Sequence, residues 1–514
     1  MKRLSIPGLV LVVVAAAFMV TGCPGRAVAG RTDMNTLIVA TAAFPPSLDP
    51  ALTNDMTSAQ LIFLIYDTLV SYAPDMSILP NLAYRWSWDD PSRIRMFLRQ
   101  GVRFHNGDLL TASDVVFSLQ RAAVSPHIGP ITGMIQDVQA INPHEVLITL
   151  QFPFTPFLSH LAHTATSIVN ERAVRELGED VHAMAPVGTG AYRVTNVVTG
   201  DRVELTRFDD FWDTPARIPN LTWRSIPDGA TRLLELETGG IDIKLLLHTM
   251  PHDIGRTEAH PDVRVYRQMS LSTNYVGFNA QRPPFNDVRV RQAVHHALDL
   301  DAINRVINPG VGETARGPIN SMVWGSIAEE LPPIAFDPAR SRQLLAEAGF
   351  PNGFSTTIYT NEGNAVRADL AEIMQHQLAA VGINVDISII EWGAYLDLTA
   401  RGEHNMFILG WVASTGDPDY GIHPLFHTSS FGTAGNRTFW GTPEVDALID
   451  AGRAETDPAR RLEIYDEIQR IIHREVPWVF WHVGEWIHAT RADVRGFQPH
   501  ATDRLRIWDV YFQS

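Results

Sequence analysis

The alternation of apolar and polar positions predicts strands in the first half of the chain. In residues 93–100, three apolar side chains alternate with arginines, and a period of two is typical of a half-buried strand. Residues 194–208 contain two more such runs, joined by a turn at Gly200-Asp201. A further strand is expected at residues 36–40.

Apolar residues spaced three or four positions apart, which predict helices, appear between these runs. They are commonest in the second half of the chain. Thr111 is expected to cap a helix, with Asp114 three residues later completing a capping box. Val290, Val294 and Leu298 form a stripe along another helical face. Further helices are expected at 337–349, 365–381, 442–450 and 457–474, with a strand at 383–389. Strands and helices mixed in this way predict an α/β architecture of several lobes.

The longest apolar run lies near the N-terminus. It covers Leu9–Val20, which is 12 residues, and follows the basic residues Lys2 and Arg3. A membrane-spanning helix needs about 20 apolar residues, whereas a signal peptide has a shorter core behind a basic start. Residues 1–22 are therefore interpreted as a signal peptide.

The single cysteine, Cys23, directly follows this run. The stretch "VTGC" resembles the bacterial lipoprotein box, which implies acylation of Cys23 and anchoring to a membrane. Residues 23–34 are then a lipid-anchored tether. The alternative is a buried, inert thiol, the commoner fate of a lone cysteine.

Composition limits the class of protein. The 514 residues include 41 Lys and Arg against 57 Asp and Glu, a formal net charge of −16. Such a chain repels nucleic acid, and it shows no basic stripe, so nucleic-acid partners are excluded. With one cysteine no disulfide forms within the chain, and the fold depends on its hydrophobic cores.

The order of motifs resembles one family of transport proteins. Residues 104–122, "FHNGDLLTASDVVFSLQRA", resemble the signature of extracytoplasmic solute-binding proteins of family 5, which serve peptide and nickel ABC importers. Asn106 replaces an acid of that signature, and Leu110 replaces a proline. Further blocks stand in the family's order: "SLDP" (47–50), "VGTGAYRV" (187–194), "NYVGFNAQRPPFNDVRVRQAV" (274–294), "EWGAYL" (391–396) and "GWVASTGDPD" (410–419).

The resemblance implies an α/β fold of the class II periplasmic-binding-protein type, with two ligand-binding lobes and an extra third domain. The implied parts are lobe I (35–52, 187–273 and 489–514), the extra domain (53–186) and lobe III (274–488). The chain then crosses between the lobes near Asn274 and near His488, which predicts a hinge. Ligand is expected between the lobes, enclosed as the hinge closes.

Two tryptophans match positions at which oligopeptide binders of this family place aromatic walls. Trp411 follows an apolar strand, where a ligand crevice normally lies, and Trp392 opens the "EWGAYL" block. A place in a hydrophobic core is the alternative for both. Gly410 lets the backbone approach a ligand closely, and an extended peptide is held by such main-chain hydrogen bonds.

Three charged residues are further candidate contacts. Arg437 in "GNRTFW" and Arg367 in "GNAVRADL" carry the guanidinium fork that binds carboxylate through two hydrogen bonds. The alternative for each is a surface arginine. Asp417 in "TGDPD" is either a ligand contact or a turn residue before Pro418.

The sequence argues against an enzyme, although a secreted peptide hydrolase is the alternative from another class. "VASTG" (412–416) lacks the first glycine of the G-x-S-x-G nucleophile elbow. His423 and His427 have Pro424 between them and no glutamate after His423, so they do not form the zinc-helix pattern. We expect a binding protein without catalytic residues, cofactor or metal.

The charged anchors of a free dipeptide are missing. The resemblance places an aspartate for the ligand amine where this chain has Ser414, and an arginine for the α-carboxylate where it has Asn361. Losing one partner of a buried charge pair costs about 2–5 kcal/mol, so a plain dipeptide is expected to bind weakly. Residues 414–426 look closer to the glutathione-binding branch. A longer peptide, held by backbone contacts and another acid such as Asp417, stays open.

The expected function is therefore that of a membrane-anchored, extracytoplasmic monomer. It delivers a peptide or glutathione to an ABC permease and its ATPase subunits. Within the family, a binder of a nickel chelate or haem is the alternative. A surface lipoprotein with a role outside transport is another.

Overall fold

The computed structural model describes residues 33–245 and 251–513, and residues 35–514 form one compact unit. The predicted signal peptide and Cys23 lie outside the described residues, so the lipid anchor stays a prediction. Within the described ranges, no helix is long and apolar enough to cross a bilayer.

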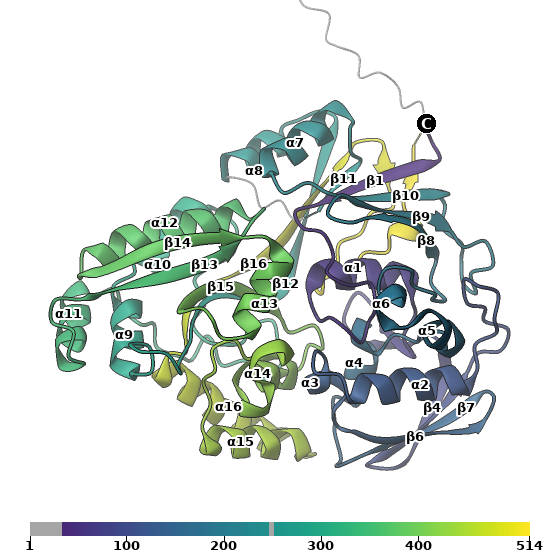
Figure 1. The fold of residues 1–514 in the computed structure, drawn as a ribbon, viewed down its shortest axis with the longest axis horizontal. Coiled ribbons are helices and arrows are strands. Elements are labelled where there is room, and N and C mark those ends of the chain that lie inside the picture. The colour runs from purple at the N-terminus through teal and green to yellow at the C-terminus, as the bar shows by residue number, and fades with distance from the viewer. Residues whose placement is uncertain (1–32, 246–250, 514) are drawn as a thin grey trace, which may run out of the picture. The chain divides into compact units, whose positions relative to one another are not determined.

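A ten-stranded mixed sheet runs through the described part of the chain (Figure 1). Its order is β14 (Ile383–Ile390), β13 (Phe354–Asn361), β15 (Met406–Val412), β12 (Val263–Phe278), β16 (Trp478–Arg491), β11 (Ile243–Lys244), β1 (Thr36–Thr41), β10 (Asn220–Ser225), β9 (Arg202–Arg207) and β8 (Tyr192–Val198). β1 pairs in parallel with β10 and β11, and β13 pairs in parallel with β14 and β15. The other neighbours are antiparallel.

Two long strands connect the part of the sheet that belongs to the predicted lobe I with the part that belongs to the predicted lobe III, and these names are kept below. β12 and β16 pair along most of their length, and β12 reaches β15 only from Ser272 onward. The register of the β12–β16 pair shifts between Met269 and Thr273, and again after Asn274. Bulges of this kind bend a strand locally, so the irregular segment lies close to the predicted crossing at Asn274. The other predicted crossing, His488, lies opposite Tyr266 in the same ladder.

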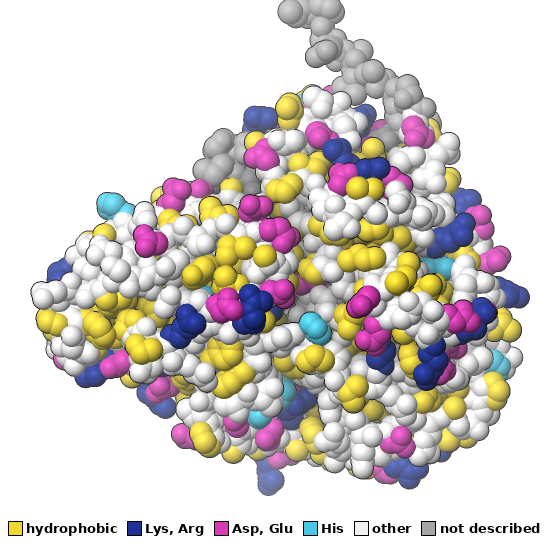
Figure 2. Space-filling view, in the orientation of Figure 1, with side chains coloured by type: hydrophobic (Ala, Val, Ile, Leu, Met, Phe, Trp, Pro, Cys, Tyr) yellow, Lys and Arg dark blue, Asp and Glu magenta, His cyan; other side chains and the backbone are white. Residues whose placement is uncertain are grey.

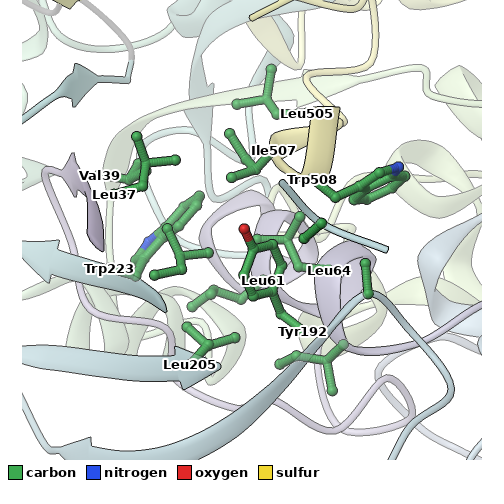
Figure 3. Close-up of a cluster of buried hydrophobic side chains, with 14 of the residues drawn as sticks. Leu37, Val39, Leu61, Leu64, Tyr192, Leu205, Trp223, Leu505, Ile507 and Trp508 are labelled. Atoms are coloured by element: carbon green, nitrogen blue, oxygen red, sulfur yellow. The ribbon is translucent and has the colours of Figure 1, made fainter. Parts of the chain in front are cut away.

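Lobe I is built around a core to which both ends of the described chain contribute. Helix α1 (Met56–Ile65) packs with strands β1, β8, β9 and β10 in one hydrophobic cluster. The cluster also takes in the short strands β17 (Val494–Arg495) and β18 (Tyr511–Phe512) and the turn η4 (Ile507–Asp509). Figure 3 shows this packing, with Leu37 and Val39 near Leu505 and Ile507. Helix α1, which the predicted boundary puts in the extra domain, thus buries its apolar face in lobe I.

Two further helices of lobe I lie beside the sheet. They are α7 (Gly229–Thr238) and α8 (Pro251–Glu258). Helix α7 is capped by Asp228 and ends at Gly239, whose φ of +85° is a conformation that glycine adopts without strain.

The extra domain is a four-stranded antiparallel sheet covered by a helix. The sheet order is β4 (Ala83–Asp90), β5 (Arg93–Leu98), β7 (Glu145–Leu150) and β6 (Ile135–Asn142), with a separate hairpin of β2 (Val70–Tyr72) and β3 (Ile78–Pro80). Its helices are α2 (Ala112–Ala123), α3 (Gly129–Thr132), α4 (Phe157–Leu161), η1 (Thr164–Thr166), α5 (Glu171–Leu177) and α6 (Glu179–His182). The capping box predicted at Thr111 and Asp114 is confirmed, since both of its bonds form at the start of α2.

Lobe III places helices around β13, β14 and β15 (Figure 1). These are α9 (Val288–His296), α10 (Leu300–Ile307), α11 (Pro338–Glu347), α12 (Ala365–Ala379), α13 (Trp392–Ala400), α14 (Pro418–Phe426), α15 (Pro443–Ala454) and α16 (Pro458–Glu475), with the turns η2 (Thr428–Ser430) and η3 (Gly432–Ala434). Two large hydrophobic clusters fill this lobe. The expected helices and strands of the second half are therefore present within a few residues of their predicted bounds.

Two details differ from the predicted stripes. Helix α9 ends at His296, so Leu298 is buried in the turn that follows rather than on the helix. Ile389, expected on the buried side of its strand, is 51% exposed. The reason is that β14 is the outer strand of the sheet, and its end is left without cover.

The surface shows charges of both signs side by side. On the face drawn in Figure 2, Lys and Arg side chains are interspersed with Asp and Glu and form no basic stripe.

Candidate ligand-binding site

A cavity of about 210 Å³ lies where lobe I, the extra domain and lobe III meet. Lobe I contributes the start of α1 and the turn at residues 502–504. The extra domain contributes His163 and Thr164, and lobe III contributes the ends of β13 and β15 and the starts of α12 and α13. The carboxyl ends of two parallel strands thus face the cavity, as ligand crevices in open α/β sheets normally require.

Seven of the eight predicted ligand contacts line this cavity. They are Asn361, Arg367, Trp392, Gly410, Trp411, Ser414 and Arg437. They come from segments as far apart in sequence as residues 361 and 437, and the fold brings them together.

Asp417 is the exception. It is the N-cap of α14, and its two carboxylate oxygens accept hydrogen bonds of 2.6 and 2.7 Å from the guanidinium of Arg461. Its carboxylate is already used within lobe III, and it is not among the residues lining the cavity. Of the two readings left open by the sequence, the structure favours the helix-start position over the ligand contact.

The two tryptophans stand at element ends. Trp392 is the first residue of α13, and its Nε1 donates to Asp55 Oδ1 at 3.3 Å. Trp411 lies near the end of β15, and its Nε1 donates to the carbonyl of Tyr420 at 2.7 Å. Both are only partly buried, and both line the cavity.

The glycine at position 410 is required by a close contact. Gly410 lies opposite Asn274 in the β12–β15 ladder, and a Cβ there would come within 2.6 Å of the Asn274 side-chain oxygen. Any larger residue would displace Asn274, which also lines the cavity. Gly410 therefore keeps this part of the wall open.

Three arginines line the cavity, and within residues 33–245 and 251–513 none of them has an ion-pair partner. Arg437, which is 6% exposed, donates from Nε to Thr399 Oγ1 at 3.1 Å. Arg367 donates from Nη1 to Asn361 Oδ1 at 2.7 Å, and Arg504 donates from Nη1 to a backbone carbonyl. None of the three forms an ion pair with an Asp or Glu of the described residues. Burial lowers the pKa of all three guanidinium groups from their ordinary value.

Two aspartates also line the cavity, and both are bonded to the protein. Asp55 is the N-cap of α1 and accepts from the Thr53 hydroxyl at 2.6 Å. Asp503 accepts from Gln60 Nε2 at 2.5 Å and lies 3.2 Å from His488. Three arginines against two aspartates give the lining a surplus of one positive charge.

The sequence did not point to Asp55, Asp503 or Arg504. Asp55 carries an N-cap signal, because it precedes an apolar helix, but a cap says nothing about a ligand. Asp503 and Arg504 belong to no motif, and their place in the cavity depends on how the C-terminal segment returns to lobe I.

On one side the cavity is closed by contacts between the extra domain and lobe III. Asp419 in α14 is fully buried, 3.1 Å from Arg453 Nε of lobe III and 3.5 Å from His160 Nε2 of the extra domain. Tyr420 packs its ring against His163, with ring centroids 5.1 Å apart. Burial lowers the pKa of His160 from its ordinary value, although the nearby Asp419 carboxylate acts in the opposite direction.

Comparison with known proteins decides the family. Residues 77–433 match the family model described as bacterial extracellular solute-binding proteins, family 5 middle. The chain belongs to this family. Its members are solute-binding components of transport systems rather than enzymes, and the role in an ABC importer inferred from the sequence motifs is confirmed.

Relatives of similar length support the assignment. The chain is 29% identical over 472 residues to the glutathione-binding protein GsiB of Pectobacterium atrosepticum, covering 90% of this chain and 91% of the relative. The GsiB of Salmonella typhi is also 29% identical, over 473 residues and the same shares of both chains.

Solved structures confirm the class II periplasmic-binding-protein fold. The periplasmic binding protein DppA of Helicobacter pylori, in complex with the peptide STSA, matches with a TM-score of 0.88 and 29% identity, over 93% of this chain and 98% of that one. A dipeptide-binding protein of Pseudoalteromonas sp. SM9913, in complex with Met-Leu, matches with a TM-score of 0.87 and 26% identity, over 93% and 100%.

Proposed function

We propose that this protein captures a small peptide-like solute that carries more carboxylates than amines, with glutathione as the first candidate. The observation that carries the proposal is the set of three cavity arginines without an acidic partner among the described residues. Glutathione has two carboxylates and one ammonium group, and its net charge of about −1 at neutral pH complements the surplus of the lining. The relatives named glutathione-binding protein support the same ligand.

The cavity replaces the dipeptide anchors that are missing at Ser414 and Asn361. Arg367 lies within hydrogen-bond distance of Asn361 and takes over the carboxylate-binding role from it. Asp55 supplies an acid for the ligand amine, beside the Trp392 indole. Because both anchors have substitutes, a dipeptide finds one carboxylate site and one amine site. Arg437 and Arg504 remain, and they favour a ligand with a second carboxylate.

Titration calorimetry with glutathione, a dipeptide and a pentapeptide tests this choice of ligand. Glutathione is expected to bind at least about tenfold more tightly than the dipeptide, because its second carboxylate pairs with the cavity's additional positive charge and the dipeptide has no such group. Acetylating the dipeptide's amine is the matched control for the contribution of Asp55. A dipeptide that binds as tightly as glutathione would contradict the proposal.

Ligand binding is proposed to close the two lobes about the β12–β16 pair. A ligand that contacts both lobes shifts the population toward the closed form by its differential affinity. Saturating glutathione should therefore reduce the radius of gyration in solution scattering and change the fluorescence of Trp411, which lines the cavity. An unchanged scattering curve at saturation would count against hinge closure.

The protein is proposed to act as a monomer held at the outer face of a membrane by acylated Cys23. There it hands its ligand to an ABC permease driven by ATPase subunits. Two acyl chains or more give stable anchoring, so Cys23→Ala should move the protein from the detergent phase to the aqueous phase in a partitioning assay. Unchanged partitioning of this variant would show that the anchor lies elsewhere.

A further inference from the structure

Arg504 lies apart from the other two cavity arginines. Arg367 and Arg437 both come from lobe III and share Tyr275 and Tyr395 as electrostatic neighbours. Arg504 belongs to the C-terminal segment, and its neighbours are Tyr72 and Tyr420. The cavity therefore has two cationic regions that are supplied by different parts of the fold.

The turn before Arg504 fixes its direction. Asp503 has φ +57°, in the left-handed region that aspartate tolerates, and its carboxylate accepts from Gln60. His500 caps the same turn through its Nδ1 contact with Thr502 Oγ1 at 2.8 Å. The acid next to Arg504 in sequence is thus bonded elsewhere and does not neutralise it.

Only part of the Arg504 guanidinium is satisfied by the protein. Nη1 donates to the carbonyl of Ala162, and the guanidinium lies 5.2 Å from the centre of the Tyr72 ring. Its Nε and Nη2 form no hydrogen bond with the described residues and are not fully shielded from solvent, and Arg504 is one of the residues that line the cavity. Arg504 is half-buried, and closing the lobes over a guanidinium without a carboxylate is unfavourable unless an anion arrives with the closure.

We propose that Arg504 forms a second carboxylate-binding position, so that the cleft selects ligands with two anionic groups, one held by Arg367 and Arg437 and one by Arg504. This inference rests on the proposed function above, since it concerns the same cavity. It assigns the role of specificity residue to a position that lies outside every motif of the sequence. An arginine fork suits this task because it binds a carboxylate through two parallel hydrogen bonds.

The test pairs variants of the protein with variants of the ligand. Glutathione is compared by calorimetry with its two monoamides, in which either the γ-glutamyl α-carboxylate or the glycine carboxylate is replaced by a carboxamide. The wild-type chain should lose about 30-fold or more in affinity for each amide. Arg504→Met should bind glutathione about 30-fold more weakly than the wild type does. This variant should bind one of the two amides as tightly as it binds glutathione, because the carboxylate that this amide lacks is the one that Arg504 would have bound.

The Arg504→Met variant should bind the other amide more weakly than it binds glutathione, because the carboxylate that this amide lacks is the one bound by Arg367 and Arg437. Arg506→Gln is the matched control, because Arg506 is exposed, pairs with Asp509 and lies only two residues away. It should bind all three ligands as the wild type does. Arg504→Lys keeps the charge without the fork and should give an intermediate loss.

The outcomes separate the two claims. If Arg504→Met lowers the affinity for all three ligands by one common factor, Arg504 only packs the C-terminal turn. The assignment of Arg504 is then wrong, while the proposed function stands. Should Arg504→Met fail to fold, the Arg504→Lys variant decides by the same comparison of amides. If wild-type protein binds neither glutathione nor its amides, the proposed function fails, and the role of Arg504 with it.

Discussion

Arg437→Met is expected to weaken glutathione binding by about 30-fold or more while leaving the stability of the ligand-free protein nearly unchanged. Arg437 is 6% exposed, and the one hydrogen bond that its guanidinium forms with the described residues goes to Thr399. Losing one partner of a buried charge pair costs about 2–5 kcal/mol of binding free energy. In the ligand-free protein Arg437 has no carboxylate partner, so the substitution breaks no charge pair and should change stability little. Calorimetry and thermal unfolding of the same preparation measure both effects.

Arg461→Met provides the matched control with the opposite pattern. Arg461 is equally buried, but its guanidinium is paired with Asp417 inside lobe III and does not line the cavity. Breaking that pair should lower the unfolding free energy by about 3–5 kcal/mol. The affinity of the folded fraction for ligand should stay near the wild-type value. If Arg437→Met destabilises as strongly as Arg461→Met and binds normally, Arg437 has a structural role only.

Asp49→Asn is expected to destabilise the protein by about 3–5 kcal/mol. Asp49 belongs to the "SLDP" block and is fully buried. Its carboxylate accepts from Arg121 Nη1 at 2.7 Å and from His182 Nδ1 at 2.8 Å, which joins lobe I to two helices of the extra domain. The asparagine keeps the shape but leaves Arg121 without its buried partner. Denaturant unfolding measures the loss, and Asp209→Asn, whose carboxylate is 79% exposed, should change stability by less than about 1 kcal/mol.

The same carboxylate gives a pH signature. Burial alone would raise the pKa of Asp49, but the hydrogen bonds from His182 and Arg121 outweigh it and hold the pKa below its ordinary value of 3.8. A carboxylate with a lowered folded-state pKa stabilises the protein above about pH 3.8 and loses that contribution as pH falls through the folded-state pKa. The stability difference between wild type and Asp49→Asn should therefore shrink below about pH 4. A difference that stays constant down to pH 2 would contradict this account.

Local signals in the sequence predicted the helices and strands well, but they predicted only some of the residues that line the cavity. The capping box at Thr111 is complete within four residues, so the start of α2 depends on nothing distant. The pairing of β12 with β16 joins residues about 215 positions apart, and no local pattern contains it. Trp392 belongs to the family block "EWGAYL", whereas Arg367 was a candidate only through its guanidinium fork. Both line the cavity, because each lies in the first turn of a helix, α13 and α12, that begins there.

The rest of the site is formed by segments that are distant in sequence and meet only in the folded protein. Asp55 and Arg504 reach the cavity from opposite ends of the sequence, and their local context signals only a helix cap and a turn. Asp417 shows the converse case, because its motif matched while Arg461, 44 residues later, takes both of its oxygens. Partners that are distant in sequence therefore decide which charged groups stay available to a ligand.

The shared core of lobe I has a consequence for the order in which the protein is made. Leu37 and Val39, among the first residues of the described chain to be synthesised, pack in one cluster with Leu505 and Ile507, among the last (Figure 3). The extra domain and lobe III are encoded between them and have cores of their own. The extra domain and lobe III are therefore fully synthesised before the core of lobe I can be completed. Until its final segment leaves the ribosome, the newborn chain carries lobe I with an incomplete hydrophobic core.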